Sequence, residues 1–355
     1  MATDKGMKMQ LGRKDIFGLD IGSYSVKLMQ MRKTNKGWSV VAGAISEINS
    51  NILGDVGRNE ANVTRAIRTC LRLSRVHTNY AVCALGGNEV AIRNFDFPSL
   101  PEDELENAVL FEARQVCPFT TTDIMVDYNL IPNGLDRSCG YLVAATHKQV
   151  SNLERITKRA KLNCAMIDAE ALSILNCFTE IEKPGPDHGT AILNIGNNHT
   201  TMVIEGKKGW PFVRNLNYAA EEVIQQIAEE HSLKQDEIRK MFLDEIDEMP
   251  SEVYRSLSKH TENFVSDIEK TLLYYSTQEN SFNIQKVLVC GGAAMYKEIV
   301  KLLSSMLPVE TVLWNPFNKI RCKWLKNTKG ILLKNMLKKN GPAMVVSAGL
   351  AMRTI

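Results

Sequence analysis

A short polar interruption divides an apolar run near the start of the chain. In IFGLDIGSYSVKLMQM, residues 16–31, Asp20 is followed by a glycine and a cluster of small polar residues, and Lys27 comes seven positions after Asp20. Such a turn exposes several backbone N–H groups with little side-chain obstruction, which suits a chain of phosphates. Asp20 could hold water ligands of Mg²⁺, and Lys27 could reach the phosphates from the next strand. Taken alone, the stretch is equally typical of a type I′ or bulged hairpin turn.

The second half of the chain repeats this design. The stretch AILNIGNNHTTMVI, residues 191–204, again places a polar turn between two strands, and the turn opens with Asn194. Farther along, the strand KVLVCGG ends in Gly291 and Gly292, which would let the backbone lie against a nucleoside. The chain has neither a Walker A sequence nor GxGxxG. The ordered set of three segments therefore predicts a nucleotide site more strongly than any one turn does.

Alternating strands and helices surround the first turn. Residues 15–31 read as strand, turn and strand, and a third strand ends near Ile45, so that the three form a β-meander. Residues 59–76 have the apolar spacing of a helix, and residues 80–87 read as a buried strand. The phosphate-binding turn is thus expected at one end of a sheet.

The pattern changes between residues 90 and 162. A strand, a helix in PEDELENAVLFEARQV, two further strands and a helix in KQVSNLERITKRAKL predict a compact unit inserted between two pieces of one lobe. Phe111, Cys117, Pro118 and Phe119 gather at the end of its first helix. They form either the core of the unit or part of a groove, between the unit and the first lobe, that takes a partner's extended peptide.

A loop separates the two halves of the chain. Residues 166–181 read as a helix, and KPGPDHG, residues 183–189, is the most loop-like segment, so we place the boundary between two lobes there. The predicted organisation is a first lobe at 1–89, an inserted subdomain at 90–162, a return to the first lobe at 163–185, a second lobe at 186–342 and a closing helix at 343–355.

Composition limits the class of protein. With 355 residues, 44% of them hydrophobic and 23% charged, the chain can build two globular lobes. Its eight cysteines form no CxxC pair and no set at metal-ligand spacing, which predicts reduced and mostly buried thiols. The N-terminal residues lack the apolar core of a signal peptide, and the apolar stretch 343–352 is too short to span a bilayer. We therefore expect a cytoplasmic protein.

The net charge of +3 conceals two strongly charged segments. Residues 319–339 hold eight lysines or arginines and no acid, whereas residues 217–252 hold eleven acids against three basic residues. A helix from about Lys329 would carry one apolar side made of Leu332, Leu333, Met336 and Leu337. We expect that side to pack on its own lobe, the alternatives being anionic lipid or an acidic partner. Nucleic acid is not expected, because the run lacks interleaved aromatic residues apart from Trp324.

These segments resemble the actin/Hsp70-type nucleotide-binding fold, and within it the PilM family of type IV pilus assembly, relatives of the division protein FtsA. FGLDIGSYSVKLMQM resembles the family's first phosphate loop, AILNIGNNHTTMVI its second, VLVCGGAAMYKEI its adenosine motif and SAGLAMR its closing helix. LPEDELENAVLFEARQVCPF is similar to the inserted subdomain that this family shares with FtsA, and PVETVLWNPF also resembles the family. The resemblance covers nearly the whole chain.

The resemblance implies an α/β, two-lobed actin/Hsp70-like (ribonuclease H-like) fold with an FtsA-type inserted subdomain. It implies that ATP or ADP binds between the lobes with Mg²⁺. The positions that it assigns to nucleotide are Asp20, Gly22, Ser23, Tyr24, Ser25, Lys27, Asn194, Gly196, Asn197, Asn198, Thr200, Glu221, Gly291, Gly292, Ala293 and Met295. Asp20, through water, and Asn194 would face the metal, and Glu170 would position an attacking water in a hydrolase. The alternative for Glu170 is an exposed or salt-bridged residue of its helix.

The resemblance also implies partners. A cytoplasmic protein of this family would be held at the inner membrane by the N-terminal tail of a PilN-like protein. It would join that membrane complex to other pilus assembly proteins, the platform or the motor ATPase, or serve a related type II secretion machinery. Self-association and a weak anionic-lipid contact through residues 319–339 are further expectations.

The chain departs from the family pattern at two places, residue 194 and the pair 219–220. Asn194 stands where the second phosphate loop usually begins with Asp, and an amide supplies no negative charge to hold a metal ion. Ala219 and Ala220 replace a Gly-Gly pair that often opens the next helix. We therefore expect slow hydrolysis or none, with nucleotide acting as a conformational ligand of both lobes. His199, inside the second loop, is expected to fill a turn.

Two rival functions use the same fold. A sugar or acetate kinase would place an acidic base in the inter-lobe cleft and would lack an inserted unit with FEARQVCPF. A filament-forming cytoskeletal protein like FtsA or MreB would need an exposed terminal membrane helix, whereas this sequence ends within its predicted closing helix.

Overall fold

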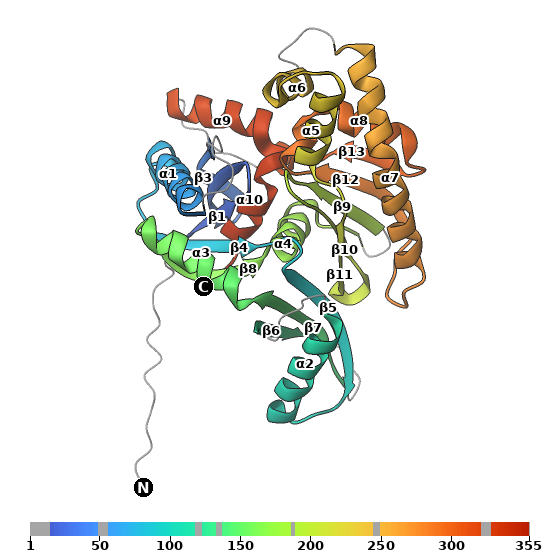
Figure 1. The fold of residues 1–355 in the computed structure, drawn as a ribbon. Helices are drawn as coiled ribbons and strands as arrows, with labels where there is room; N and C mark the ends of the chain where they lie inside the picture. Colours follow the sequence, from blue (N-terminus) through green and yellow to red (C-terminus); the bar gives the residue numbers. More distant parts are fainter. Residues whose placement is uncertain are drawn as a thin grey trace.

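The first sheet contains the N-terminal meander. The computed structural model describes residues 15–48, 56–117, 123–132, 137–185, 189–243, 249–320 and 328–354. The strand order is β3-β2-β1-β4-β8 (Figure 1). β1 to β3 pair in antiparallel fashion, whereas β4 and β8 continue the sheet parallel to β1. The bounds are Phe17–Ile21 for β1, Ser25–Thr34 for β2, Gly37–Glu47 for β3, Tyr80–Leu85 for β4 and Asn163–Ala169 for β8.

The second sheet repeats the order and directions of the first. Its order is β11-β10-β9-β12-β13, with β9 to β11 antiparallel and β12 and β13 parallel to β9. The bounds are Gly189–Ile195 for β9, Thr200–Glu205 for β10, Pro211–Leu216 for β11, Ile284–Cys290 for β12 and Glu310–Leu313 for β13. This duplication confirms the predicted pair of meanders, and it places each polar turn between the first two strands of a sheet.

Helices cover both faces of each sheet. On the first sheet, α1 (Val56–Ser74) and α3 (His147–Arg159) enclose one apolar cluster, and α4 (Glu170–Glu182) and α10 (Val345–Ala351) pack on the other face. One face of the second sheet shares an apolar cluster with α5 (Ala220–Glu230), α6 (Gln235–Phe242), α7 (Ser251–Ser276) and α8 (Lys297–Met306), where α6 packs on α5. Its other face contributes Ile192, Val203 and Leu288 to the cluster around α4 and α10. The two lobes therefore share a central core.

The inserted unit projects from the body of the molecule (Figure 1). Its sheet has the order β5-β7-β6, with β5 at Val90–Pro98, β6 at Ile124–Leu130 and β7 at Arg137–Thr146. Helix α2 (Glu102–Val116) covers this sheet through Leu105, Val109 and Ala113.

The apolar helix end in this unit differs from the expectation. Phe111 is 64% exposed and does not belong to the core, because α2 turns Val109 and Ala113 inward instead. Cys117 packs partly buried against the core, and Pro118 and Phe119 lie outside the described residues.

A second correction concerns the start of α4. The sequence suggested a helix over 166–181, but residues up to Ala169 form β8 and the helix begins at Glu170. The reason is tertiary, since β8 pairs in parallel with β4 along the edge of the first sheet. Glu170 consequently lies at the carboxyl end of a strand, where the sheet faces the space between the lobes.

The basic segment forms a helix, α9 (Thr328–Asn340), whose packed apolar side is narrower than predicted. Leu337 is buried, and Leu333 and Met336 approach Gly43 of β3, so that the apolar side contacts the first sheet. Leu332 lies on the outer side and is 64% exposed, because the inward arc is centred on Leu333 and Leu337. Residues 319–320 are described, whereas 321–327 are not.

The described residues also form short 3₁₀ turns at Lys207–Gly209 (η1), Ala293–Met295 (η2), Pro316–Asn318 (η3) and Gly341–Met344 (η4). In the part of the chain that is described, no helix is both long and apolar enough to cross a bilayer.

Candidate functional site

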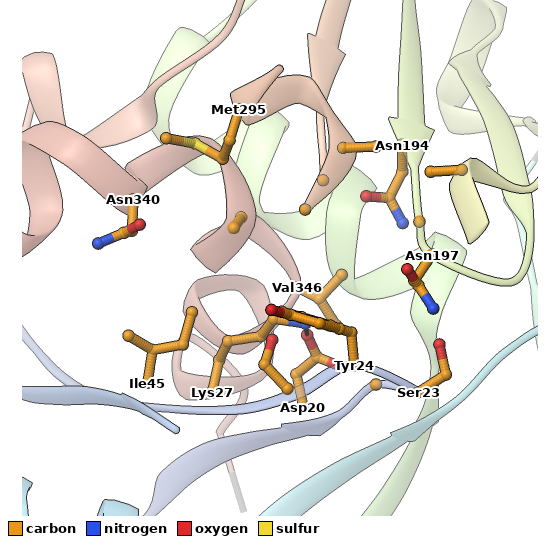
Figure 2. A pocket seen from close by; sticks show the side chains of 18 of the residues that line it. Asp20, Ser23, Tyr24, Lys27, Ile45, Asn194, Asn197, Met295, Asn340 and Val346 are labelled. Atoms are coloured by element: carbon orange, nitrogen blue, oxygen red, sulfur yellow. Dashed lines mark ion pairs between the residues drawn. The ribbon is translucent and has the colours of Figure 1, made fainter. Parts of the chain in front are cut away.

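A cavity of about 380 Å³ lies between the lobes and is lined from both sheets (Figure 2). Figure 2 shows Asp20 and Lys27 on one side of it, with Asn194 and Met295 across the space. The predicted residues that line it are Asp20, Gly22, Ser23, Tyr24, Ser25, Lys27, Glu170, Asn194, Gly196, Asn197, Asn198, Gly291, Gly292, Ala293 and Met295. Segments separated by more than two hundred residues in the sequence thus meet at one cavity.

Thr200 and Glu221 are predicted residues that do not line the cavity. Thr200 is fully buried, and its hydroxyl donates to the carbonyl of Tyr218 at 2.8 Å. The carboxylate of Glu221 pairs with Arg239. Both residues instead hold neighbouring segments of the second lobe in place.

The two polar turns close in the same way. The Gly22 N–H donates to the Ser25 carbonyl at 3.1 Å, and the Gly196 N–H donates to the His199 carbonyl at 2.9 Å. In the first turn the antiparallel register sets Asp20 directly opposite Lys27, which explains the seven-residue spacing. The equivalent backbone geometry supports the interpretation of the two turns as one repeated device.

Asp20 and Lys27 form a largely buried ion pair. The Lys27 ammonium lies 3.1 Å from the Asp20 carboxylate, and the side chains are 11% and 13% exposed respectively. Burial raises the pKa of Asp20, and the positive charge of Lys27 offsets part of that rise. Lysine has three donor hydrogens, so Lys27 can contact Asp20 and still donate into the cavity.

Glu170 is held by two polar side chains from the second lobe. The Asn194 amide nitrogen donates to Glu170 Oε1 at 2.6 Å, and His199 Nε2 lies 3.1 Å from Oε2. Burial alone would raise the pKa of Glu170, but the hydrogen bond and charge of His199, together with Asn194, bring it below its ordinary value. Burial would lower the pKa of His199, and Glu170 raises it above its ordinary value. His199 therefore does more than fill a turn.

Arg239 is a cavity residue that sequence reasoning missed. Its side chain is 9% exposed, its guanidinium pairs with Glu221, and it lies 3.3 Å from the Tyr296 hydroxyl. It also lies over the ring of Tyr24, with 5.0 Å from the guanidinium carbon to the ring centroid. In the sequence Arg239 is one of three basic residues among the eleven acidic residues of segment 217–252, and nothing there distinguishes it from surface residues.

The end of α9 also reaches the cavity. Lys339 and Asn340 line it, as do Ala343 and Val346. The Gly291 N–H donates to the Pro342 carbonyl at 2.9 Å and so joins this segment to the Gly-Gly strand end. The sequence marked this segment only by the basic charge of residues 319–339, which did not indicate that Lys339 lines the cavity.

Gly291 and Gly292 have different surroundings. Gly291 adopts φ of 99°, and a side chain there would collide with Asn194 and the carbonyl of Ile195. Gly292 has no atom within 4 Å of the position of a Cβ, so the backbone beside it is open. This open backbone is compatible with the predicted contact to a nucleoside.

A second groove, of about 680 Å³, runs between the inserted unit and the first lobe. One wall contains Met125 to Asn129 of β6, and the other contains Met166 to Ala169 of β8. Arg353 lies in it and donates to Asp168 at 2.7 Å. Phe111 and Cys117 are not among its lining residues, so the predicted groove is made by other side chains.

Comparisons with known proteins agree with this geometry. A sequence model described as type IV pilus assembly protein PilM matches residues 18–355. The solved PilM-PilN type IV pilus biogenesis complex contains a similar chain, with 21% identity, coverage of 96% of this chain and 99% of that one, and a TM-score of 0.80.

More distant solved structures share the arrangement. The ethanolamine utilization protein EutJ from Carboxydothermus hydrogenoformans is 13% identical, with 95% and 88% of the two chains covered and a TM-score of 0.55. A diol dehydratase-reactivating factor in nucleotide-free form is 12% identical, with 94% and 98% covered and a TM-score of 0.53. The predicted two-lobed, actin-like ATPase fold is confirmed.

Proposed function

The chain belongs to the family of type IV pilus assembly protein PilM, and from this premise we propose that it is a nucleotide-binding adaptor of pilus assembly. In this proposal ATP or ADP binds in the cavity between the lobes, and a PilN-like membrane protein inserts its N-terminal tail into the second groove. The observation that carries the proposal is the convergence of both polar turns and the Gly-Gly strand end on one cavity.

The residues present fit a nucleotide. Turn residues 23–24 and 197–198 offer backbone N–H groups, Lys27 offers a buried cation, and Gly292 leaves its backbone open. A ligand held by both lobes favours the arrangement in which both sets of contacts exist. ATP would therefore act as a conformational ligand that stabilises the closed lobes.

Slow or absent hydrolysis is part of the proposal. Glu170, the candidate for positioning water, already accepts hydrogen bonds from Asn194 and interacts with His199. A general base must be free to accept a proton from water within hydrogen-bond reach. Glu170 in this arrangement serves better as a link between α4 and the second lobe.

The second groove suits an extended peptide. β6 is at the edge of the three-stranded sheet and β8 is at the edge of the first sheet, and both line the groove. Exposed strand edges bind extended peptides through main-chain hydrogen bonds, while neighbouring pockets take alternate side chains. The similar chain in the PilM-PilN complex supports PilN as the partner class.

Location and organisation follow as further parts of the proposal. The protein would lie in the cytoplasm and reach the inner membrane through its PilN-like partner, with the platform or motor ATPase as other contacts. We propose the same division into lobes, inserted subdomain and closing helix that the sequence predicts.

The test uses a fluorescent peptide with the sequence of the N-terminal tail of the PilN-like protein that is encoded next to this chain. We expect the peptide to bind the wild-type protein, and Met125→Lys to weaken binding at least about tenfold by placing a charge in the groove. Leu130→Lys is the matched control, because Leu130 is similarly exposed on β6 but is not among the groove-lining residues. A folded wild-type protein that does not bind the peptide, or equal effects of the two variants, would contradict the partner assignment.

A further inference from the structure

We infer that this cavity binds its nucleotide without a divalent cation, with basic side chains in place of the metal's charge. This inference rests on the proposed nucleotide site. It concerns Asp20, Asn194 and Glu170, each of which already has a partner within the protein.

The carboxylate of Asp20 is the first such acceptor. It is 13% exposed and lies 3.1 Å from the Lys27 ammonium. A cation beside Asp20 would have to compete with that ammonium at close range, and two positive charges near one carboxylate repel each other. Lys27 thus already supplies a positive charge that balances the Asp20 carboxylate.

The amide of Asn194 is the second acceptor, and as a neutral group it supplies no negative charge to hold a metal ion. Its nitrogen donates to Glu170 Oε1 at 2.6 Å, so its donor end points toward the carboxylate. Its oxygen accepts from the Cys290 thiol at 3.9 Å and lies beside Gly291. The second lone pair of that oxygen stays available to a water, so the amide offers a metal only a neutral and indirect contact.

The carboxylate of Glu170 is the third acceptor. His199 Nε2 lies 3.3 Å from Oε1 and 3.1 Å from Oε2, and Oε1 also accepts from Asn194. Mg²⁺ requires near-octahedral oxygen coordination and usually keeps several waters beside one or two carboxylates. Among the described residues, no group of three or more His, Cys, Asp or Glu side chains is placed to hold a metal ion. Asp20 and Glu170 are both paired with a basic side chain, with which Mg²⁺ would have to compete for either carboxylate.

Basic groups supply the missing positive charge. Lys27 lines the cavity from the first lobe, Arg239 lines it from α6, and Lys339 lines it from the end of α9. Guanidinium and ammonium groups both bind phosphate oxygens through charge-assisted hydrogen bonds. Since the three come from separate elements, together they can neutralise a polyphosphate from several directions.

The experiment is a calorimetric titration of ATP into the full chain, in buffer with EDTA and in buffer with excess Mg²⁺. We expect the two dissociation constants to agree within about threefold, which is below 1 kcal/mol. Asn194→Asp restores a carboxylate at the cavity and should introduce metal dependence, with binding at least about tenfold tighter in Mg²⁺ than in EDTA.

Asn198→Asp is the matched control, because it adds the same charge to the same turn in a cavity-lining residue. It should weaken binding by a similar factor in both buffers, without metal dependence. Wild-type binding that requires Mg²⁺ would overturn this inference and leave the nucleotide site standing. Absence of binding in both buffers, with a folded protein, would overturn the nucleotide site and this inference together.

Discussion

Tyr24 and Arg239 meet across the cavity, with the guanidinium carbon of Arg239 5.0 Å from the centroid of the Tyr24 ring. Tyr24 belongs to the polar turn of the first lobe, and Arg239 belongs to α6 of the second. Arg239 is itself held by Glu221 and by the Tyr296 hydroxyl. The contact is therefore a direct link between the lobes in the lining of the proposed nucleotide site.

Removing the ring should weaken that link. We expect Tyr24→Ala to lower the free energy of unfolding by about 0.5–2 kcal/mol, the usual range for a cation–π contact that is partly desolvated. Tyr24→Phe keeps the ring and should lose less. Urea denaturation of both variants measures the difference. Equal losses would show that the hydroxyl, and not the ring, makes the stabilising contact.

The ion pair between Glu170 and His199 should make stability depend on pH. The pKa of His199 is raised above 6.5, so its contribution is complete below pH 6.5 and is lost as the pH rises through the raised value. The pKa of Glu170 is lowered below 4.5, so its contribution is present above pH 4.5 and is lost as the pH falls through the lowered value. The pair therefore stabilises the fold fully only between these two limits.

Comparison of the wild type with His199→Gln at about pH 5.5 and about pH 8.5 tests this window, which the linkage relation defines. The free energy lost on substitution should be larger at the lower pH. His77→Gln is the control, because His77 is exposed on the surface. A loss from His199→Gln that is the same at both pH values would mean that His199 acts through packing and not through charge.

The repeated turns could be predicted from the sequence because the interruption is local. Asp20 and Lys27 sit opposite each other in one hairpin, and their spacing alone brings them together. The Gly-Gly strand end and the fold were likewise recognisable from short runs with a clear pattern. Where a site residue depends on backbone geometry within one turn, its position can be read from neighbouring residues.

The remaining site residues depend on contacts between distant segments. Arg239 reaches the cavity because α6 packs against α5, and Lys339 reaches it because α9 packs on β3. Neither position differs from an ordinary surface residue in local sequence. The prediction of a helix at residues 166–169 was wrong for the same reason, because these residues form a strand by pairing with β4. In residues 166–169 strand pairing overrides the local preference, and at Arg239 and Lys339 tertiary packing decides what the side chain faces.

Replacing a leucine with alanine should have different effects on the two sides of α9. Leu337 is 1% exposed in the central core, whereas Leu332 is 64% exposed. We expect Leu337→Ala to cost about 2–5 kcal/mol of unfolding free energy, because it leaves a cavity in a packed region. Leu332→Ala should change it by no more than about 0.5 kcal/mol. Thermal or urea unfolding of the two variants distinguishes this packing from the predicted one, in which both leucines are buried.

Gly291 and its neighbour provide a matched test of the Gly-Gly strand end. Gly291 has φ of 99°, and a methyl group there would meet Asn194 and the Ile195 carbonyl, whereas Gly292 is open and has φ of −63°. Gly291→Ala combines unfavourable left-handed backbone, about 1–2 kcal/mol, with a steric clash, and it should lower the free energy of unfolding by more than that. Gly292→Ala should leave the stability nearly unchanged.

Ligand binding separates a structural role from a functional one at these two positions. If a nucleoside lies against the open backbone of Gly292, Gly292→Ala should weaken ATP binding while the unfolding curve without ligand stays in place, because the added methyl group occupies the ligand's space. Calorimetry and urea denaturation of the same preparation give both quantities. Unchanged ATP affinity in folded Gly292→Ala would place the nucleoside away from this strand end, even where the polyphosphate stays between the two turns.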